Sequence, residues 1–165
     1  MKLSEAPGTA ASVHIQAPPD RVWAVATDLP RFGQWSPENR GGRWLDGADG
    51  QSVGHRFEGT QEHPAVGTWT TVATIVECDP CVRYSWIVGT ADDPGATWLF
   101  TFEATDDGTR LDQRVTIGPG PSGISVAIEA MPDKEDRILQ RRLEEHDRGM
   151  AAVLDGIKHA AEGSG

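Results

Sequence analysis

The chain has 165 residues, a formal net charge of −10 at pH 7 and 24% charged residues. This length fits one domain with a complete hydrophobic core, and the acidic balance argues against nucleic-acid binding and against electrostatic docking to an anionic membrane. No run approaches the ~20 apolar residues of a membrane span and residues 1–12 lack the apolar core of a signal peptide, so the sequence predicts a cytoplasmic protein with no membrane span.

The N-terminal region predicts a tail, one strand and two short helices. Residues 1–10 are expected to form a flexible tail. Apolar and polar residues alternate over Ala11–Ala17, which indicates a half-buried strand. Pro18 and Pro19 end this strand and favour the first turn of a helix. A second short helix or turn is expected over Arg31–Trp35, after the next proline.

Between residues 43 and 117 the pattern is typical of strands throughout. Asp-Gly and Asp-Pro turn signals separate the apolar runs, and strands this closely spaced indicate an antiparallel meander. The expected strands cover Arg43–Leu45, Val53–Thr60, Gly67–Cys78, Val82–Gly89, Ala96–Glu103 and Thr109–Ile117.

The C-terminal part predicts one long helix. Gly118–Gly123 is expected to be a linker within the domain, and the pattern of Ile124–Met131 is ambiguous. Pro132 precedes acidic residues that favour a first helical turn, and an apolar stripe continues to about residue 161. We expect one domain over residues 11–162, followed by a tail over residues 163–165.

These elements together predict an α+β fold. An antiparallel sheet with one apolar face must bury that face, and only the C-terminal helix is long enough to cover it. We therefore expect a curved antiparallel sheet wrapped around the long C-terminal helix, with two short helices after the first strand. A concave sheet packed on one helix is difficult to fill in its middle, which favours an internal cavity.

Alternation with a period of two identifies the side chains that point inward. These aromatic residues either fill the core or line a pocket for an apolar molecule, and the pattern leaves both interpretations open. The inward set comprises Phe57, Trp69, Tyr84, Trp86, Trp98, Phe100 and Phe102, while Trp35 is expected at the mouth of the pocket.

Four polar residues are expected to point into the same space: His55, Tyr84, Gln113 and His146. His146 and Met150 lie on the apolar stripe of the last helix, and both are expected to contact the ligand. For His146, a satisfied core histidine and a ligand contact or general base are competing interpretations. His55 and His146 would meet only if the fold places them across the pocket from each other. His63 and His159 are expected in solvent.

Cys78 and Cys81 lie at the two ends of a turn between strands. This position lacks the helix dipole that lowers a thiol pKa, and a second ligand pair for zinc is missing, which argues against redox chemistry and against a metal site. In a reducing cytoplasm, free thiols are expected. The ends of such a turn are nevertheless close enough for a disulfide, which stays open. The five histidines show no metal-ligand spacing, and no hydrolase elbow or nucleotide-binding glycine motif occurs. We expect no metal and no cofactor.

Four segments carry a resemblance to a known family: Val13–Trp23, Asp28–Ser36, Val76–Pro80 and Gly108–Leu111. In this order they resemble the START-like superfamily, also called SRPBCC, and within it the polyketide cyclase/dehydrase branch. The resemblance implies a helix-grip fold with a deep pocket. The pocket entrance is then expected near the short helices and the strand-connecting loops.

Two functions fit these features, so enzymatic activity stays uncertain at this stage. The chain either binds a small hydrophobic or aromatic molecule, polyketide- or lipid-like, or it acts as a polyketide cyclase, aromatase or dehydratase. In the second case His55, Tyr84 and His146 would transfer protons, and Gln113 would orient a carbonyl group. The patterning supports a protein-interaction module less well, and a homodimer stays open.

Overall fold

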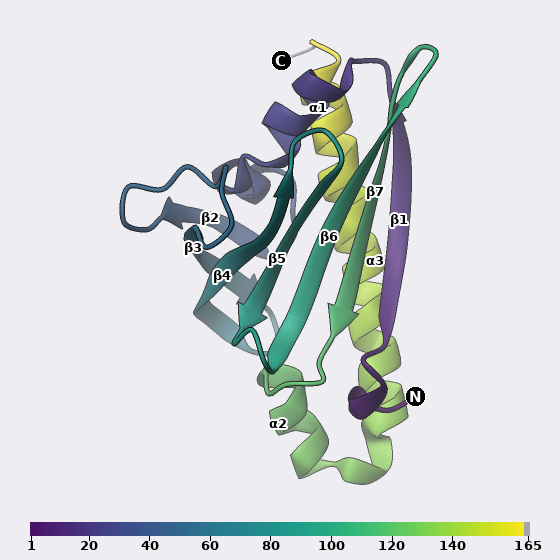
Figure 1. Ribbon diagram of the computed structural model, residues 1–165. Helices are drawn as coiled ribbons and strands as arrows, with labels where there is room; N and C mark the ends of the chain where they lie inside the picture. Colours follow the sequence, from purple (N-terminus) through teal and green to yellow (C-terminus); the bar gives the residue numbers. More distant parts are fainter. Residues whose placement is uncertain (164–165) are drawn as a thin grey trace.

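The structure is a computed structural model that describes residues 1–163 (Figure 1). Its main element is a seven-stranded antiparallel sheet with the strand order β1-β7-β6-β5-β4-β3-β2. The first strand therefore pairs with the last one, and β2 forms the opposite edge. The strands are β1 (Gly8–Ile15), β2 (Asn39–Trp44), β3 (Arg56–His63), β4 (Gly67–Asp79), β5 (Arg83–Gly89), β6 (Pro94–Thr105) and β7 (Gly108–Ile117).

Helices occupy three stretches of the chain. The short 3₁₀ turn η1 precedes β1, α1 and η2 lie between β1 and β2, and α2, η3 and α3 follow β7. The long helix α3 runs the length of the sheet and packs along β1 (Figure 1). The predicted arrangement, a curved sheet around a long C-terminal helix with two short helices after the first strand, is confirmed. The bounds are η1 (Leu3–Glu5), α1 (Pro19–Ala26), η2 (Leu29–Gln34), α2 (Gly123–Ala130), η3 (Pro132–Lys134) and α3 (Glu135–Ala161).

The strand register gathers the predicted aromatic residues on the inner face of the sheet. Trp86 lies opposite Trp98, and Phe100 lies opposite Gln113. Tyr84 and Phe100 are completely buried. The expected alternation is confirmed for these strands because successive side chains of a pleated strand point to opposite faces and α3 covers only one face.

β4 departs from strict alternation near its end. The register shifts between Ile75 and Glu77, which brings Cys78 opposite Tyr84 on the inner face. Cys78 and Cys81 are half-buried against the core, and both are free thiols. Burial raises the pKa of each thiol because the thiolate loses solvation there.

The N-terminal strand begins earlier than predicted. β1 starts at Gly8 rather than Ala11, because residues 8–10 continue the pairing with β7. The preceding residues contact α3, where the backbone N–H of Leu3 donates to a carboxylate oxygen of Glu135 at 2.8 Å. This bond lowers the pKa of Glu135. The contact with a helix distant in sequence explains why local composition suggested only a tail.

Three further elements correct the prediction. β2 begins at Asn39 rather than Arg43, where Asn39 pairs with Gln61 of β3. β3 begins at Arg56 rather than Val53, since Gly54 has a φ of +93° that a strand does not accommodate. Residues 124–131, ambiguous in the sequence, lie mostly in α2, which buries none of its residues. Of the predicted C-terminal tail, residues 164–165 lie outside the described residues.

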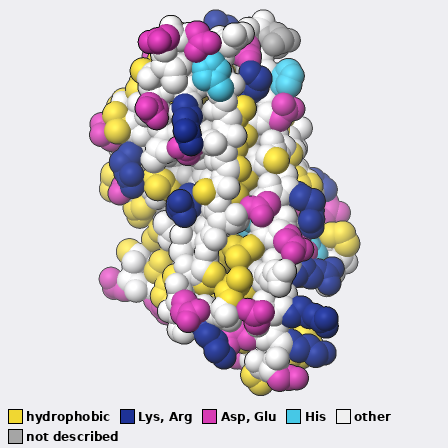
Figure 2. All heavy atoms as spheres, turned by 90° about the vertical axis from the view of Figure 1, so that its right-hand side faces the viewer, with side chains coloured by type: hydrophobic (Ala, Val, Ile, Leu, Met, Phe, Trp, Pro, Cys, Tyr) yellow, Lys and Arg dark blue, Asp and Glu magenta, His cyan; other side chains and the backbone are white. Residues whose placement is uncertain are grey.

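On the face where α3 and β1 lie, acidic and basic side chains are interspersed (Figure 2). Hydrophobic side chains appear between them, and this face carries no broad region of a single charge. The net charge of −10 is therefore not gathered into one patch on this side of the molecule.

Candidate ligand-binding site

The loop between β2 and β3 is pinned to the core beside α1. The buried hydroxyl of Tyr84 donates to the carbonyl oxygen of Gly50 at 2.8 Å. The indole Nε1 of Trp23 donates to the side-chain oxygen of Gln51 at 2.9 Å. Burial raises the pKa of Tyr84 and keeps its hydroxyl protonated. A hydroxyl committed to a backbone carbonyl favours a structural role for Tyr84 over proton transfer.

His55 belongs to the same loop and is half-buried. Its Nδ1 accepts the backbone N–H of Gly50 at 3.2 Å and lies 3.4 Å from a carboxylate oxygen of Asp49. The side chain is 32% exposed and lines a surface hollow of about 290 Å³ formed by this loop. His55 and His146 therefore have separate surroundings, and the structure does not bring them together.

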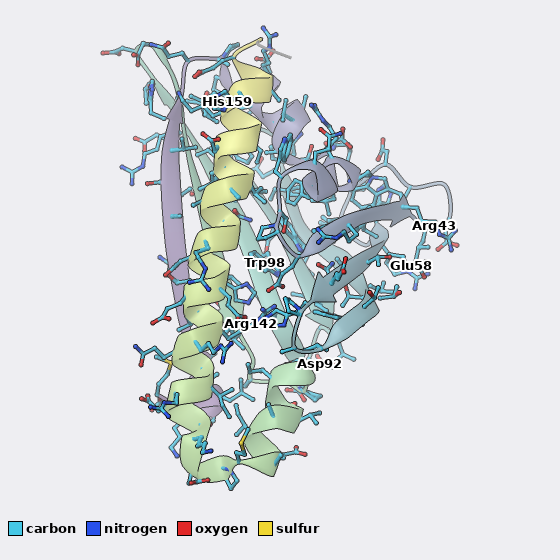
Figure 3. All side chains as sticks on the ribbon, turned by 180° about the vertical axis from the view of Figure 1, so that it is seen from behind. Arg43, Glu58, Asp92, Trp98, Arg142 and His159 are labelled. Atoms are coloured by element: carbon cyan, nitrogen blue, oxygen red, sulfur yellow. The ribbon has the colours of Figure 1, made fainter. Side chains whose placement is uncertain are left out.

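A series of aromatic rings leads from Tyr84 to α3. Ring centroids lie 6.0 Å apart for Tyr84 and Trp86, 6.1 Å for Trp86 and Trp98, and 5.1 Å for Trp98 and His146. Tyr84 is completely buried, whereas Trp98 is half-buried. Figure 3 shows Trp98 between α3 and the opposite side of the sheet. Water therefore reaches these rings at Trp98 and His146, and not at Tyr84.

Gln113 is a buried amide with incomplete hydrogen bonding. It lies on the inner face of β7, opposite Phe100 and Ala11, and is 2% exposed. Within residues 1–163, its Oε1 is the only buried side-chain oxygen or nitrogen that has no hydrogen-bond partner. Leaving a buried acceptor unpaired costs about 1–3 kcal/mol, so this oxygen would be stabilised by an external donor.

His146 projects from α3 toward β6, where its ring meets Trp98 edge-on at an interplanar angle of 89°. Burial lowers the pKa of His146 to about 4, and the positive charge of Arg142 acts in the same direction. The imidazole is therefore neutral near pH 7, with one nitrogen that donates and one that accepts. Met150, the next predicted site residue on α3, is 1% exposed and fills the core.

The other predicted site residues differ in burial. Phe57 is buried, with Trp44 edge-on to its ring. Trp69 is half-buried on the inner face of β4. Trp35 is also half-buried and lies directly on Gly156 of α3, where a Cβ atom would overlap the indole ring. Sequence reasoning missed this contact, although a glycine inside a long helix is a signal for close packing.

Sequence reasoning also missed a polar network between α3 and the far side of the sheet. Arg142 donates to both carboxylate oxygens of Glu38, at 2.6 and 2.9 Å, and to Glu145 at 2.8 Å. His63 Nε2 lies 3.2 Å from Glu145 Oε1. Each of these side chains is at most 22% exposed. The expectation that His63 lies in solvent is wrong, because the curled sheet brings the end of β3 against α3.

The hydrogen bonds define the charges of this network. The backbone N–H of Ala65 donates to Nδ1 of His63 at 3.0 Å, so Nε2 carries the ring proton and donates to Glu145. Burial favours a neutral Glu145, but hydrogen bonds from Arg142 and His63 outweigh it and lower the pKa of Glu145. Burial likewise opposes the charge of Arg142, and its two carboxylate partners outweigh it and raise the pKa. One potential metal-ligating atom from each of Glu38, His63 and Glu145 lies within 4.8 Å of the others. The guanidinium of Arg142 already provides a positive charge to these two carboxylates.

Comparison with known proteins identifies a family for most of the chain. The family described as polyketide cyclase / dehydrase and lipid transport matches residues 8–152. None of the curated protein sequences matches the chain. In the part of the chain that the structure describes, no helix has the length and apolar character needed to cross a membrane.

Solved structures share the fold. The Polyketide_cyc-like protein Cgl2372 from Corynebacterium glutamicum is 26% identical, with a TM-score of 0.67 over 94% of this chain and 91% of that one. The di-domain ARO/CYC StfQ from the steffimycin biosynthetic pathway is 17% identical, with a TM-score of 0.70 over 94% of this chain and 50% of that one. Ara h 8.0201 is 11% identical, with a TM-score of 0.60 over 94% of this chain and 97% of that one. The last two likenesses support the helix-grip fold alone.

Proposed function

The chain belongs to the polyketide cyclase, dehydrase and lipid transport family, and on that premise we propose that it binds a small hydrophobic or aromatic molecule between its sheet and α3. The proposed site consists of Trp98, Gln113 and His146. Gln113 is the diagonal neighbour of Trp98 across β6 and β7, and His146 faces Trp98 from α3. An apolar surface with a few polar groups is typical of small-molecule sites.

The observation that carries this proposal is the unpaired Oε1 of Gln113. A buried acceptor among aromatic side chains is costly in the free protein, and a ligand with a hydroxyl group would remove that cost. Trp98 and His146 remain half-buried beside it, so a ligand there would displace water from aromatic surface. The ligand that fits best is therefore apolar and bears at least one hydroxyl group.

A second candidate function is catalysis by the same site, as a polyketide cyclase, aromatase or dehydratase. The observation that favours it is the imidazole of His146 against Trp98, which stays neutral near pH 7 and so has a nitrogen that can accept a hydrogen bond from a substrate hydroxyl. The amide of Gln113 would then orient a carbonyl or enol group. Tyr84 and His55 are left out of this role, because the hydroxyl of Tyr84 donates to the carbonyl oxygen of Gly50 and His55 lines the separate hollow at the β2–β3 loop.

The remaining expectations concern surroundings and partners. The absence of a nucleic-acid partner is inferred from the net charge of −10, and a cytoplasmic location stays a proposal. The homodimer stays a proposal, and sedimentation equilibrium of the purified chain tests it.

Three matched naphthalenes test the binding proposal. 2-Naphthol offers a hydroxyl donor, 2-methoxynaphthalene lacks it, and 2-naphthoate adds a charge. We expect 2-naphthol to bind about tenfold more tightly than the ether in isothermal titration calorimetry, since one hydrogen bond to a buried acceptor contributes about 1.5 kcal/mol. 2-Naphthoate should bind least well, because its carboxylate would be buried without a positively charged partner.

The variant Gln113→Met retains the side-chain volume and removes the acceptor. We expect it to bind 2-naphthol and the ether equally. Gln140→Met, on the exposed side of α3, is the matched control and should retain the preference. Failure of all three naphthalenes to bind the natural chain would refute binding of small aromatic molecules here, whereas equal affinities for alcohol and ether would refute the role of Gln113.

A further inference from the structure

The long helix meets the two edges of the sheet in different ways. On one side, α3 packs closely along β1, and completely buried residues such as Leu139 and Ile157 lie on its apolar face. On the other side, toward β2 and β3, polar side chains make the connection near Arg142, and the indole of Trp35 rests on Gly156 further along the helix. Figure 3 shows Arg142 projecting from α3 on this side, near Trp98. The contact of α3 with the side toward β2 and β3 is therefore weaker than its contact with β1.

We propose that Glu38, His63, Arg142 and Glu145 form a latch over the entrance to the ligand site, and that the ligand enters where these side chains separate. This latch rests on the proposed binding function. It joins three separate segments: Glu38 from the η2–β2 connection, His63 from the end of β3, and Arg142 with Glu145 from α3.

The latch residues are immediate neighbours of the site. Glu145 directly precedes His146, and Arg142 lies one turn before His146 on the same side of α3. His63 pairs with Gly67 at the β3–β4 turn. Gly67 in turn lies two residues before the inward Trp69. The latch side chains are partly exposed, so they lie at the boundary between solvent and the half-buried tryptophans.

The chemistry of the contact suits a latch better than a permanent brace. Each of its four side chains has a charged or hydrogen-bonded partner while it is closed, which holds α3 against the η2–β2 connection and β3 in the absence of ligand. When it opens, the freed carboxylates and guanidinium become fully hydrated. Separation of the apolar contact between α3 and β1 would instead expose hydrocarbon with no compensation. Opening on the side toward β2 and β3 therefore exposes only the indole of Trp35, whereas separation along β1 would expose the whole apolar face of α3.

The aromatic contact beside the latch belongs to the same moving segment. Trp35 lies three residues before Glu38 and rests on Gly156, and the guanidinium of Arg31 lies 5.3 Å from its ring centre. Movement of the η2–β2 connection away from α3 would break the ion pair and lift the indole together. The entrance would then open from Arg142 toward Gly156 along one side of α3.

Arg142→Gln and Arg40→Gln form a matched pair for the test. Arg40 makes an ion pair with Glu62 at 2.8 Å, but that pair joins β2 to β3 and leaves α3 untouched. Both substitutions remove one positive charge and introduce the same side chain. Glu38→Gln is a second latch variant that keeps the side-chain shape, and thermal unfolding verifies that all three variants fold.

The first measurement needs no ligand. A neutral nitroxide in solution broadens the NMR signal of an indole N–H in proportion to its exposure, and Trp98→Phe identifies the Trp98 signal. We expect Arg142→Gln and Glu38→Gln to raise the broadening at Trp98 about threefold, with Trp23 unchanged and Arg40→Gln without effect. Unchanged broadening at Trp98 in both latch variants would overturn the latch, as would an equal increase at Trp23, which indicates general loosening.

The second measurement uses 2-naphthol in stopped-flow mixing. Both latch variants should raise the association and dissociation rates about threefold and leave the Kd nearly unchanged, because a latch controls passage rather than the bound state. Rates equal to those of the natural chain would overturn the latch while leaving the binding function intact. Absence of 2-naphthol binding to the natural chain counts against the binding function, and the nitroxide measurement then decides the latch alone.

Discussion

His146 should make the stability of the protein depend on pH in a defined window. In the unfolded chain its pKa returns to about 6.5, whereas burial beside Trp98 holds it at about 4 in the folded protein. Below pH 6.5 the unfolded chain therefore binds a proton that the folded chain excludes, and acid favours unfolding. The free energy of unfolding should fall by about 2 kcal/mol between pH 7.5 and pH 5, and by up to about 3 kcal/mol at lower pH.

Urea denaturation across this pH range measures the effect. His146→Phe keeps an aromatic ring against Trp98 and removes the titration, so its stability should be nearly constant from pH 7.5 to pH 5. Glu145 and Glu135, whose pKa values are lowered, lose their stabilising contribution only below about pH 4.5 and leave the upper window clear. His14→Gln, at an exposed position, is the control and should follow the natural chain. Parallel pH profiles for the natural chain and His146→Phe would refute the burial argument.

Three further outcomes follow from the packing. Gly156→Ala should destabilise the protein by about 1–3 kcal/mol because the new methyl group overlaps an indole ring, whereas Gly149→Ala, with open space at its Cβ, should be neutral or stabilise by up to about 1 kcal/mol in urea denaturation. Tyr84→Phe should cost about 1–2 kcal/mol through its lost hydrogen bond and leave the Kd for 2-naphthol unchanged; a large change in Kd would contradict its structural role. Cys78 and Cys81 should react with iodoacetamide at pH 7.5 about tenfold more slowly than in the unfolded chain, and equal rates would contradict their raised pKa values.

Much of the candidate site could be predicted from strand alternation. The pleat has a period of two, so the inward positions of Trp86, Trp98 and Gln113 follow from the order of residues alone. The helical stripe likewise placed His146 toward the sheet. The position of His55 could not be predicted in this way. Gly54 keeps His55 out of β3, and strand alternation does not apply in a loop.

The latch lay beyond sequence reasoning for a different reason. Its side chains are separated by up to about a hundred residues in the sequence. Only Arg142 and Glu145, three residues apart on one helix, have a spacing that predicts a contact. Ion pairs of this kind depend on the curvature of the sheet, which the alternation of residues does not report.

Local order in the sequence determined the elements, their inward faces and the family, because hydrophobic periodicity and turn residues act over a few positions. Tertiary structure alone decided which inward polar groups are satisfied within the protein and which stay available to a ligand. It committed the hydroxyl of Tyr84 to a backbone carbonyl, left Oε1 of Gln113 without a donor, and held His146 neutral against Trp98. Hydrogen-bond partners and desolvation are properties of neighbours in space, and the curled sheet brings those neighbours together from distant parts of the chain.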